Sequence, residues 1–391
     1  MIERWNLVLE LAALEENHLR RSLRQLDSPQ GTKVQVDGRD LINFSSNDYL
    51  GLSGHERVKN AMIDGITRYG AGSGASRLVC GTLRPHHVLE EHLADFKGTE
   101  AALTFSSGYA VALGTIPALV GSNDVIILDK LCHASLVDAA RLSGATIRVF
   151  PHNHLEKLAK LLATSQGRRT LVVTESIFSM DGDAALLREI VDLKDQHGAW
   201  LLLDEAHAVG VLGPQGRGLA ASLGLDGRID LHMGTLSKAF GLSGGYLAAS
   251  RATIDLLINR ARSFIYSTAP SPAIAHAAST ALEVIRSIEG DTLRAQLLEL
   301  IGRLLDHDLP GLVQRDIPSA ILPVIVGDED RAMQLSTRLR ELGFLIPAIR
   351  YPTVARGSAR LRITLSASHT REQVDALAAC LTSRGNKKEE P

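Results

Sequence analysis

Cysteine pairs, long apolar runs and an excess of one charge are all missing from this sequence of 391 residues. Its three cysteines (Cys80, Cys132 and Cys380) are odd in number, lie far apart and include no C-x-x-C pair. This spacing predicts neither a disulfide framework nor a zinc site, and it favours a reducing compartment. We therefore expect a cytoplasmic protein without a metal site.

The charge and the hydropathy exclude two further classes of protein. A formal net charge of −2 produces no global positive field that could hold nucleic acid or an anionic membrane. The longest nearly apolar stretch, Tyr109 to Gly121, contains a proline and is too short to span a bilayer. Residues 1–20 lack the basic-then-apolar order of a signal peptide. We expect neither nucleic acid nor a membrane among the partners.

What the sequence does contain is an ordinary globular composition, with 45% hydrophobic and 22% charged residues. From about Gly51 to Arg286, short apolar runs alternate with longer segments of helical periodicity, such as Leu187–His197. The predicted strands are Ala101–Phe105, Val125–Leu128, Thr146–Phe150, Thr170–Thr174, Trp200–Asp204, Leu231–Gly234 and Gly245–Ala249. This pattern indicates an α/β fold, with a mostly parallel seven-stranded sheet flanked by helices.

The length exceeds what one hydrophobic core usually spans, so we expect more than one domain. Residues 1–50 are predicted to form an N-terminal segment, residues 51–288 a large α/β domain and residues 289–391 a smaller C-terminal α+β domain. The N-terminal segment should contain a hairpin that turns at Asp37-Gly38, and an amphipathic helix marked by Trp5, Val8, Leu9, Ala12 and Leu19. In the C-terminal domain we predict strands Ile321–Val326 and Leu361–Thr364 and helices Arg331–Leu342 and Arg371–Leu381.

Polar residues at strand ends are the first candidates for a site, because ligands bind beyond the carboxyl ends of parallel strands. The predicted strand 200–204 ends in Asp204-Glu205-Ala206-His207. Three interpretations compete: an aspartate that caps a helix, the Asp-Glu-Ala-His box of nucleic-acid helicases, and an aspartate that holds the pyridine nitrogen of pyridoxal phosphate. The helicase is rejected, because the chain has no G-x-x-x-x-G-K-[ST] phosphate loop and is too short for two motor domains.

The third interpretation requires a lysine at another strand end, and Lys238 follows the predicted strand 231–234. The chain has ten lysines against 32 arginines, and no other lysine lies between Lys194 and Lys387. Lysine can lose its proton when buried and form a Schiff base, whereas arginine stays protonated. The alternative is an ordinary surface lysine, but small residues on both sides of Lys238 would let the backbone approach a bulky ligand.

Other strand ends also carry short polar residues. Ser106-Ser107-Gly108-Tyr109 stands between a predicted strand and an apolar helix, which suits a phosphate group. His133 follows the predicted strand 125–128, and it could lie flat on a cofactor ring or be satisfied within a turn. A fourth polar run, Thr174 to Asp183, follows the predicted strand 170–174.

Two further features have plainer interpretations. The glycine-rich run from Gly70 to Arg77 lacks the G-x-G-x-x-G spacing of a dinucleotide site, and we interpret it as an adaptable loop near the ligand. His152 and His154 are expected to be surface residues and not metal ligands.

Taken together, these residues resemble the α-oxoamine synthases, a branch of the fold-type-I pyridoxal-phosphate enzymes. The resemblance extends over essentially the whole chain. Its motifs are Asn43-Phe-Ser-Ser-Asn-Asp-Tyr-Leu-Gly51, Gly72-Ser-Gly-Ala-Ser-Arg77, His133-Ala-Ser135, Phe178-Ser-Met-Asp-Gly-Asp183, Asp204-Glu-Ala-His207, Gly234-Thr-Leu-Ser-Lys238, Tyr266-Ser-Thr268 and Arg360-Leu-Arg-Ile-Thr364. The resemblance implies pyridoxal 5'-phosphate as cofactor, the transferase fold of type I, and a homodimer with cofactor sites at the subunit interface.

Position by position, the resemblance implies three groups of site residues. The implied catalytic residues are Lys238, which carries the cofactor on its amine, Asp204, which pairs with the pyridinium nitrogen, His207, which contacts the ring hydroxyl, and His133, which stacks on the ring. Further implied cofactor contacts are Ser107, Gly108, Tyr109, Glu175, Ser179, Thr235 and, from the second subunit, Thr268. The implied substrate contacts are Arg362 for the amino-acid carboxylate, Arg21 and Thr353 for the acyl substrate, and Asn47 and His133.

Members of this branch join an amino acid to an acyl thioester and release carbon dioxide. The segments Arg20-Arg21 and Ala348-Ile-Arg-Tyr-Pro-Thr353 are most similar to members that condense L-alanine with pimeloyl-coenzyme A, or pimeloyl acyl carrier protein, in biotin biosynthesis. Tyr351 and Ala355 depart from the family pattern, which has proline at these positions. The alternatives are condensation of glycine with an acetyl, succinyl or palmitoyl thioester, an aminotransferase or lyase of the same fold, and a non-catalytic cofactor-binding protein.

Overall fold

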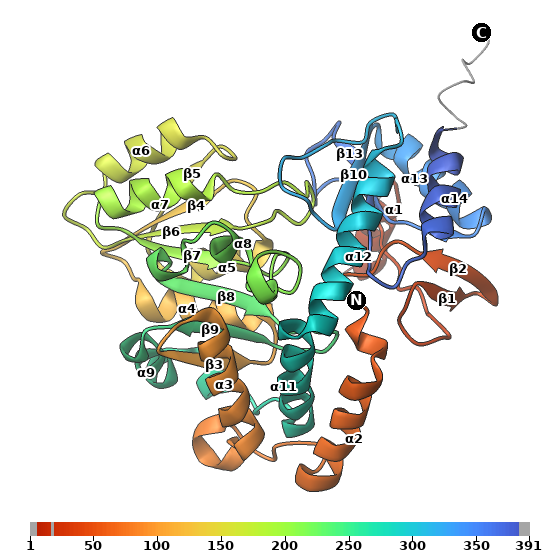
Figure 1. Cartoon of the computed structure of the whole chain (residues 1–391). Coiled ribbons are helices and arrows are strands. Elements are labelled where there is room, and N and C mark those ends of the chain that lie inside the picture. Colours follow the sequence, from red (N-terminus) through yellow and green to blue (C-terminus); the bar gives the residue numbers. More distant parts are fainter. Residues whose placement is uncertain (1–5, 17–18, 383–391) are drawn as a thin grey trace.

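The structure, a computed structural model, describes residues 6–16 and 19–382. Its largest feature is a seven-stranded sheet flanked by helices (Figure 1). The strands lie in the order β3–β9–β8–β7–β6–β4–β5, and β9 runs antiparallel to both of its neighbours while the other six strands share one direction. Their bounds are β3 Ala101–Phe105, β4 Val125–Asp129, β5 Thr146–Phe150, β6 Thr170–Glu175, β7 Trp200–Asp204, β8 Leu231–Thr235 and β9 Gly245–Ala249.

Both faces of this sheet are buried. Leu201 and Leu203 belong to one hydrophobic core, whereas Leu202, between them, belongs to a second core. Because successive side chains of a strand point to opposite faces, each core lies on its own side of the sheet. The predicted strands are confirmed to within one residue at each end, and the predicted α/β fold with a mostly parallel sheet is confirmed as well.

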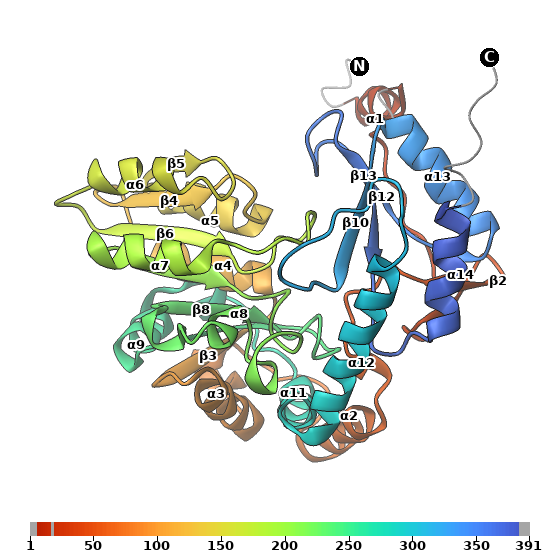
Figure 2. The ribbon, with the colours of Figure 1, turned by 45° about the horizontal axis from the view of Figure 1, so that its top comes forward.

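The helices of the large region precede, connect or follow these strands and extend the two cores. Their bounds are α2 Glu56–Tyr69, α3 Arg84–Lys97, α4 Gly108–Leu119, α5 Ala134–Ser143, α6 Leu155–Ala163, α7 Leu187–Gln196, α8 Leu219–Ser222, α9 Arg251–Arg260, α10 Arg262–Ile265, α11 Pro272–Arg286 and α12 Ile288–Leu305. Figure 2 shows α12 running between the large sheet and a small C-terminal sheet. That small sheet is antiparallel and has the order β10–β13–β12. Its strands are β10 Ile321–Gly327, β12 Ala348–Ile349 and β13 Ala359–Thr364. The helices of the same region are α13 Glu329–Glu341 and α14 Arg371–Thr382.

The N-terminal hairpin forms part of a third sheet. Strands β1 (Lys33–Val36) and β2 (Arg39–Asn43) are joined at Asp37 and Gly38, which both have positive φ, at 52° and 72°. Such a pair is typical of the tight turns whose twist matches antiparallel strands, and the predicted hairpin is confirmed. Strand β11 (Phe344–Leu345) pairs with β2 in parallel, so the beginning and the end of the chain meet here, which the sequence interpretation did not anticipate.

The N-terminal helix α1 (Leu7–Glu16) is confirmed, but none of its residues is buried. Val8 keeps 75% of its surface exposed and Leu9 keeps 64%. Trp5, which we placed on the apolar face of this helix, lies outside the described residues. Across residues 6–16 and 19–382, no helix has the length and apolar character needed to cross a membrane.

Candidate active site

The carboxyl ends of three adjacent parallel strands bring the predicted catalytic residues together. Glu175 ends β6, Asp204 ends β7 directly beside it, and Thr235 ends β8, three residues before Lys238. Burial lowers the pKa of Lys238 to about 8, although the nearby charges of Asp204 and Glu175 act in the opposite direction. An amine with this pKa can exchange its proton near neutral pH, which an exposed lysine does not do.

His207 links this amine to the N-terminal segment. The Lys238 Nζ lies 2.8 Å from His207 Nε2, and the other ring nitrogen, Nδ1, contacts the Tyr49 hydroxyl at 2.5 Å. Burial and then the positive charge of Lys238 hold the pKa of His207 well below its usual range, so the imidazole is neutral. With its proton on Nδ1 the ring donates to Tyr49, whose hydroxyl donates to Asn47 Oδ1 at 3.3 Å, and Nε2 accepts from the amine.

Asp204 and Glu205 are neighbours in sequence, but their side chains have different hydrogen-bond partners. Asp204 Oδ1 accepts the Ala206 N–H at 2.9 Å, and Oδ2 can accept a further donor; burial raises the pKa of this carboxyl. Glu205 instead accepts a hydrogen bond from Lys97 at 2.5 Å, and both side chains are fully buried. The helix-cap interpretation of Asp204 is wrong, because residues 206–210 form turns and no helix begins there.

His133 and Glu175 form the side of the site nearest β4 and β6. The His133 backbone N–H donates to Glu175 Oε1 at 2.5 Å, and the ring Nδ1 accepts from the Ser135 N–H at 3.2 Å. Burial lowers the pKa of His133, whereas burial and the charge of Asp204 raise the pKa of Glu175 to about 8. A neutral, oriented imidazole of this kind can present its flat face to an aromatic ring.

Arg362 approaches the cluster from β13 of the small sheet. Its Nε donates to the Ser179 carbonyl at 2.7 Å, and Nη1 donates to Asn47 Oδ1 at 3.1 Å and to Thr364 Oγ1 at 2.9 Å. The side chain is buried, and among the residues that the structure describes no carboxylate forms an ion pair with it. A buried guanidinium of this kind is suited to the carboxylate of a ligand. A cavity of about 420 Å³ is lined by Asn47 and Ser237 beside these groups.

The first turn of α4 provides a site for an anion. Ser107 caps the helix by accepting the Ala110 N–H, and the helix begins at Gly108. A Cβ at Gly245 would lie 2.7 Å from Gly108 N, so β9 can come this close only because residue 245 is glycine. Thr235 lies against Gly108, and its hydroxyl donates to the Gly244 carbonyl at 2.9 Å. The first N–H groups of a helix lack intrahelical partners and favour a phosphate.

Four of the predicted contact residues lie on exposed parts of the chain. Arg21 Nη2 and Thr353 Oγ1 are 3.4 Å apart, so residues separated by more than three hundred positions are adjacent, but both are exposed. Thr268 is also exposed and forms an isolated bridge with Ser76. Tyr109, 43% exposed, donates a hydrogen bond to Asp138.

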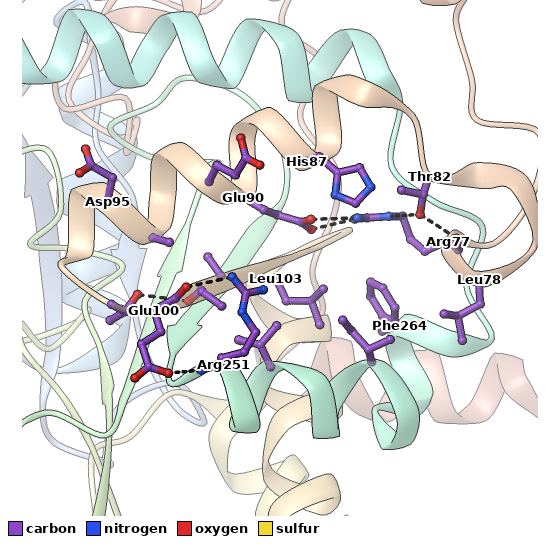
Figure 3. A pocket seen from close by; sticks show the side chains of 17 residues that line it. Arg77, Leu78, Thr82, His87, Glu90, Asp95, Glu100, Leu103, Arg251 and Phe264 are labelled. Carbon is purple, nitrogen blue, oxygen red and sulfur yellow. Dashed lines mark hydrogen bonds and ion pairs between the residues drawn. The ribbon is translucent and has the colours of Figure 1, made fainter.

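The interpretation of the glycine-rich run as an adaptable loop is wrong at its last residue. Arg77 is buried and forms two hydrogen bonds to the Glu90 carboxylate, at 2.9 and 3.0 Å (Figure 3). These two residues and Phe264 line a cavity of about 560 Å³ beside the edge strand β3. This cavity contains none of the predicted catalytic residues.

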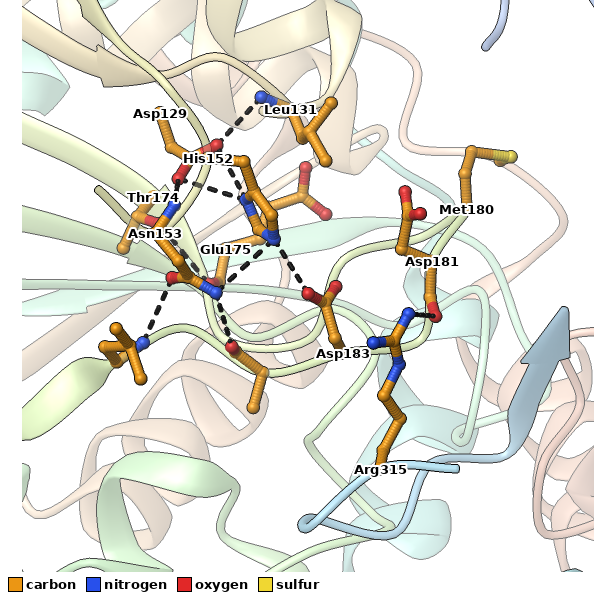
Figure 4. A network of polar contacts seen from close by, with 12 residues as sticks. Asp129, Leu131, His152, Asn153, Thr174, Glu175, Met180, Asp181, Asp183 and Arg315 are labelled. Atoms are coloured by element: carbon orange, nitrogen blue, oxygen red, sulfur yellow. Dashed lines mark hydrogen bonds and ion pairs between the residues drawn. The ribbon is translucent and has the colours of Figure 1, made fainter. Parts of the chain in front are cut away.

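His152 is less exposed than we expected of a surface residue. The side chain is 22% exposed, and its two ring nitrogens contact the carboxylates of Asp129 and Asp183 (Figure 4). His154, by contrast, is exposed and accepts the Lys157 N–H at the start of α6. The searched part of the chain, residues 6–16 and 19–382, contains no group of three histidine, cysteine or acidic side chains arranged for a metal.

Sequence reasoning did not single out Tyr49, although its hydroxyl contacts His207 in the centre of the site. The available signal was its place two residues after Asn47 in a polar motif. Tyrosine at such a position is equally compatible with ordinary core packing, and Tyr49 is in fact fully buried.

The residues fit pyridoxal phosphate on chemical grounds. Lys238 offers an amine of lowered pKa for an aldehyde, Asp204 offers a buried carboxylate for a ring nitrogen, and the start of α4 offers N–H groups for a phosphate. The unpaired buried charge of Arg362 offers a place for a substrate carboxylate.

Comparison with known proteins agrees with this chemistry. The family model described as aminotransferase class I and II matches residues 39–381. An 8-amino-7-oxononanoate synthase from Anaeromyxobacter dehalogenans is 50% identical over 96% of this chain and 94% of the relative. Among solved structures, a serine palmitoyltransferase from S. paucimobilis with bound pyridoxal phosphate is 30% identical, with a TM-score of 0.90 over 97% of this chain and 96% of that one. An 8-amino-7-oxononanoate synthase from Francisella tularensis is 30% identical, with a TM-score of 0.75 over 88% of this chain and 97% of that one.

Proposed function

Because the chain belongs to the class I and II aminotransferase family, and within it to the α-oxoamine synthases, we propose that it is a pyridoxal-phosphate-dependent acyltransferase of biotin biosynthesis. It condenses L-alanine with a pimeloyl thioester to give 8-amino-7-oxononanoate, carbon dioxide and the free thiol of the carrier. The observation that carries this proposal is the identity of about one half, over nearly the whole chain, to relatives of that name. It agrees with the cluster formed by the half-buried Lys238 and the buried Asp204 and His207.

The cofactor would be held by residues from five strand ends, those of β3, β4, β6, β7 and β8. Lys238 would carry it covalently, Asp204 would face the ring nitrogen, and His207 the ring hydroxyl. His133 would cover the ring face, with Ser179 and Glu175 beside it. The phosphate would lie near Ser107, Gly108, Tyr109 and Thr235. When bound, pyridoxal phosphate supplies an electron sink for negative charge at the substrate Cα, and this chemistry belongs to the cofactor itself.

The chain's own residues orient the substrate and move protons. Arg362 binds the alanine carboxylate with the Nη2 side of its planar guanidinium, because Nε and Nη1 already donate to Ser179, Asn47 and Thr364. This contact fixes the orientation of the bonds at Cα. The Lys238 amine would be freed when the alanine amine takes its place on the cofactor, and it would then remove the Cα proton, a role that the pKa of about 8 of the free amine permits. After the new bond to the thioester carbon has formed and the carbon–sulfur bond has broken, loss of carbon dioxide leaves Cα to regain a proton from the Lys238 ammonium. The Asp204 carboxylate would accept a hydrogen bond from the protonated ring nitrogen and would favour that protonated form.

The test is mass analysis of the product made by the purified, cofactor-loaded protein from L-alanine and pimeloyl-coenzyme A. We expect 8-amino-7-oxononanoate with equal amounts of free thiol and carbon dioxide. Parallel assays use glycine with acetyl-, succinyl- and palmitoyl-coenzyme A, and pimeloyl acyl carrier protein as the other form of the donor. Product from glycine alone would assign the chain to another reaction of the branch, and amino-group transfer without thiol release would contradict the acyltransferase.

We further propose that the working form is a cytoplasmic homodimer. Thr268 is exposed on a loop beside Tyr266, which keeps 71% of its surface exposed, and this loop would reach the phosphate of the second subunit's cofactor. Cys80 and Cys132 are free thiols, which suits a reducing compartment. Sedimentation analysis of the cofactor-loaded protein tests the dimer, and a single species of monomer mass would contradict it.

A further inference from the structure

His152 lies between two acidic side chains at the edge of the site (Figure 4). Its Nδ1 is 3.1 Å from Asp129 Oδ1, and its Nε2 is 2.8 Å from Asp183 Oδ2. Its ring is nearly perpendicular to that of Phe178, at an interplanar angle of 81° with centroids 4.3 Å apart. The three side chains come from the end of β4, the turn after β5 and the loop after β6, so the histidine joins segments that are remote in sequence.

Both contacts require the histidine to be doubly protonated. Carboxylate oxygens are acceptors, so each ring nitrogen must donate a proton, and a neutral imidazole can donate only one. Burial alone would lower the pKa of His152, but the hydrogen bonds to Asp129 and Asp183 raise it to about 10. The imidazolium therefore persists throughout the neutral pH range and acts as a fixed cation between two anions.

Asp129 holds the turn that carries His133. Its Oδ1 accepts the Leu131 N–H at 2.8 Å, and its Oδ2 accepts the Asn153 N–H at 3.0 Å. The side chain is fully buried at the last residue of β4, and its carbonyl accepts the Cys132 N–H. His133 follows immediately, so the position of its ring depends on where the Asp129 carboxylate is held.

Asp183 closes the loop that contacts Arg362. Its carbonyl accepts the Phe178 N–H at 2.9 Å, and this makes a compact turn from residue 178 to residue 183. Within the turn, the Ser179 carbonyl accepts from Arg362 Nε at 2.7 Å. The same turn packs closely against β10 at Gly182. A Cβ atom added at this glycine would lie only 2.2 Å from the Ile321 carbonyl oxygen, so the two backbones leave no room for a side chain. A shift of this turn would therefore move the support of the Arg362 fork.

We propose that His152 is a positioning residue that fixes the spacing between His133 and Arg362, by tying the turn after β4 to the loop after β6. This inference rests on the proposed function, in which His133 faces the cofactor ring and Arg362 binds the alanine carboxylate. If the distance between the His133 ring and the Arg362 guanidinium changed, alanine could no longer reach both the cofactor and Arg362 in its best orientation. The binding of alanine would therefore be weakened more than the binding of the acyl donor. The acyl donor would be much less affected, because its proposed contacts, Arg21 and Thr353, lie outside this network.

The test compares His152→Gln with the matched control His154→Gln in cofactor-loaded protein. Glutamine keeps one donor but cannot donate to both carboxylates. We expect the dissociation constant for L-alanine, read from the change in cofactor absorbance without any acyl donor, to rise about tenfold, as for a displacement of a fraction of an ångström. The KM for alanine should rise in parallel, while the KM for pimeloyl-coenzyme A stays within about twofold. His154→Gln should change neither constant, because its side chain only caps an exposed helix.

Several outcomes would overturn the positioning role. These are an unchanged alanine dissociation constant in loaded His152→Gln, an equal rise in both substrate constants, or an equal effect of the control. If His152→Gln fails to fold, Asp183→Asn is the second variant, because it removes one of the two carboxylates that contact His152 and its side chain is only partly buried. The dissociation constant for alanine should again rise without a matching rise in the KM for pimeloyl-coenzyme A. Unmodified protein that binds alanine but forms no product would refute the proposed reaction, while the binding comparison would still decide the role of His152.

Discussion

The proposed cofactor end and the proposed acyl end of the site are held in different ways. At the cofactor end, Asp204 ends a buried strand, and His207 and Lys238 follow in the turns directly after β7 and β8. Their side chains contact one another or the adjoining backbone at 2.8–2.9 Å. At the acyl end, Arg21 and Thr353 meet in one exposed contact of 3.4 Å between a coil and a loop. Exposed contacts of this kind contribute little, because water and salt compete with them. The difference implies that reaction chemistry is preorganised in this chain and that acyl recognition is not.

The largest effect is expected at the centre of the buried end. Lys238→Ala removes the amine that holds the cofactor and moves the Cα proton, so turnover should fall by at least about 10⁴-fold. The purified variant should also lack the near-visible absorbance of the loaded protein. The matched control is Lys157→Ala, an exposed lysine on α6. A fully active Lys238→Ala would refute both the mechanism and the contrast between the two ends.

Glu205→Gln tests the support beneath the cofactor end. Burial alone would raise the pKa of Glu205, but Lys97 and then His232 lower it to about 2. A group whose pKa is depressed on folding stabilises the protein above its unfolded pKa of about 4.3, and this stabilisation is lost as pH falls toward the folded value. The pair should therefore contribute about 3 kcal/mol at pH 7. Denaturant unfolding of the loaded protein should show that loss in the variant at pH 7, and a shrinking difference toward pH 3.

The control for this prediction is an exposed ion pair. Asp95 is 69% exposed where it meets Arg286 at 2.7 Å. Asp95→Asn should change the free energy of unfolding by less than about 0.5 kcal/mol. The prediction would be contradicted if Glu205→Gln and Asp95→Asn lowered the free energy of unfolding equally, or if the loss in Glu205→Gln did not depend on pH. Either result would show that burial of the Lys97–Glu205 pair does not increase its contribution to stability.

Arg362→Lys tests whether the planar fork itself is needed. Lysine keeps the positive charge but offers a single point of contact, so it cannot satisfy Ser179, Asn47 and a carboxylate together. The KM for alanine should rise roughly tenfold or more, with a smaller change for pimeloyl-coenzyme A. Steady-state kinetics with each substrate varied in turn measures both. Equal changes in the KM values for alanine and pimeloyl-coenzyme A would show that Arg362 supports the packing of the site and does not bind the alanine carboxylate.

The buried end was also the part that could be predicted from the sequence. Asp204 and Lys238 come at or shortly after the ends of apolar runs. A run of this kind predicts a buried parallel strand, and the residues at its carboxyl end are then expected at the edge of the sheet where ligands bind. The pairing of β11 with β2 could not be predicted, because it joins two-residue and five-residue strands separated by some three hundred positions. His152 was not recognised as a paired residue for a related reason: its two carboxylate partners come from other segments, and nothing local in the sequence marks them.

The smallest effect is expected at the exposed end. Arg21→Ala removes one contact of 3.4 Å between exposed groups, so the KM for pimeloyl-coenzyme A should rise by only about threefold at low salt. Raising the ionic strength should reduce the difference further, because exposed charges are screened. The KM for alanine should not change, since Arg21 lies outside the Arg362 network. Arg24→Ala, a change of the same kind in the same exposed coil, provides the control. A loss of a hundredfold for Arg21→Ala alone would mean that the acyl substrate itself draws this arginine into a closed, desolvated site, and the two ends would then differ only before the acyl substrate binds.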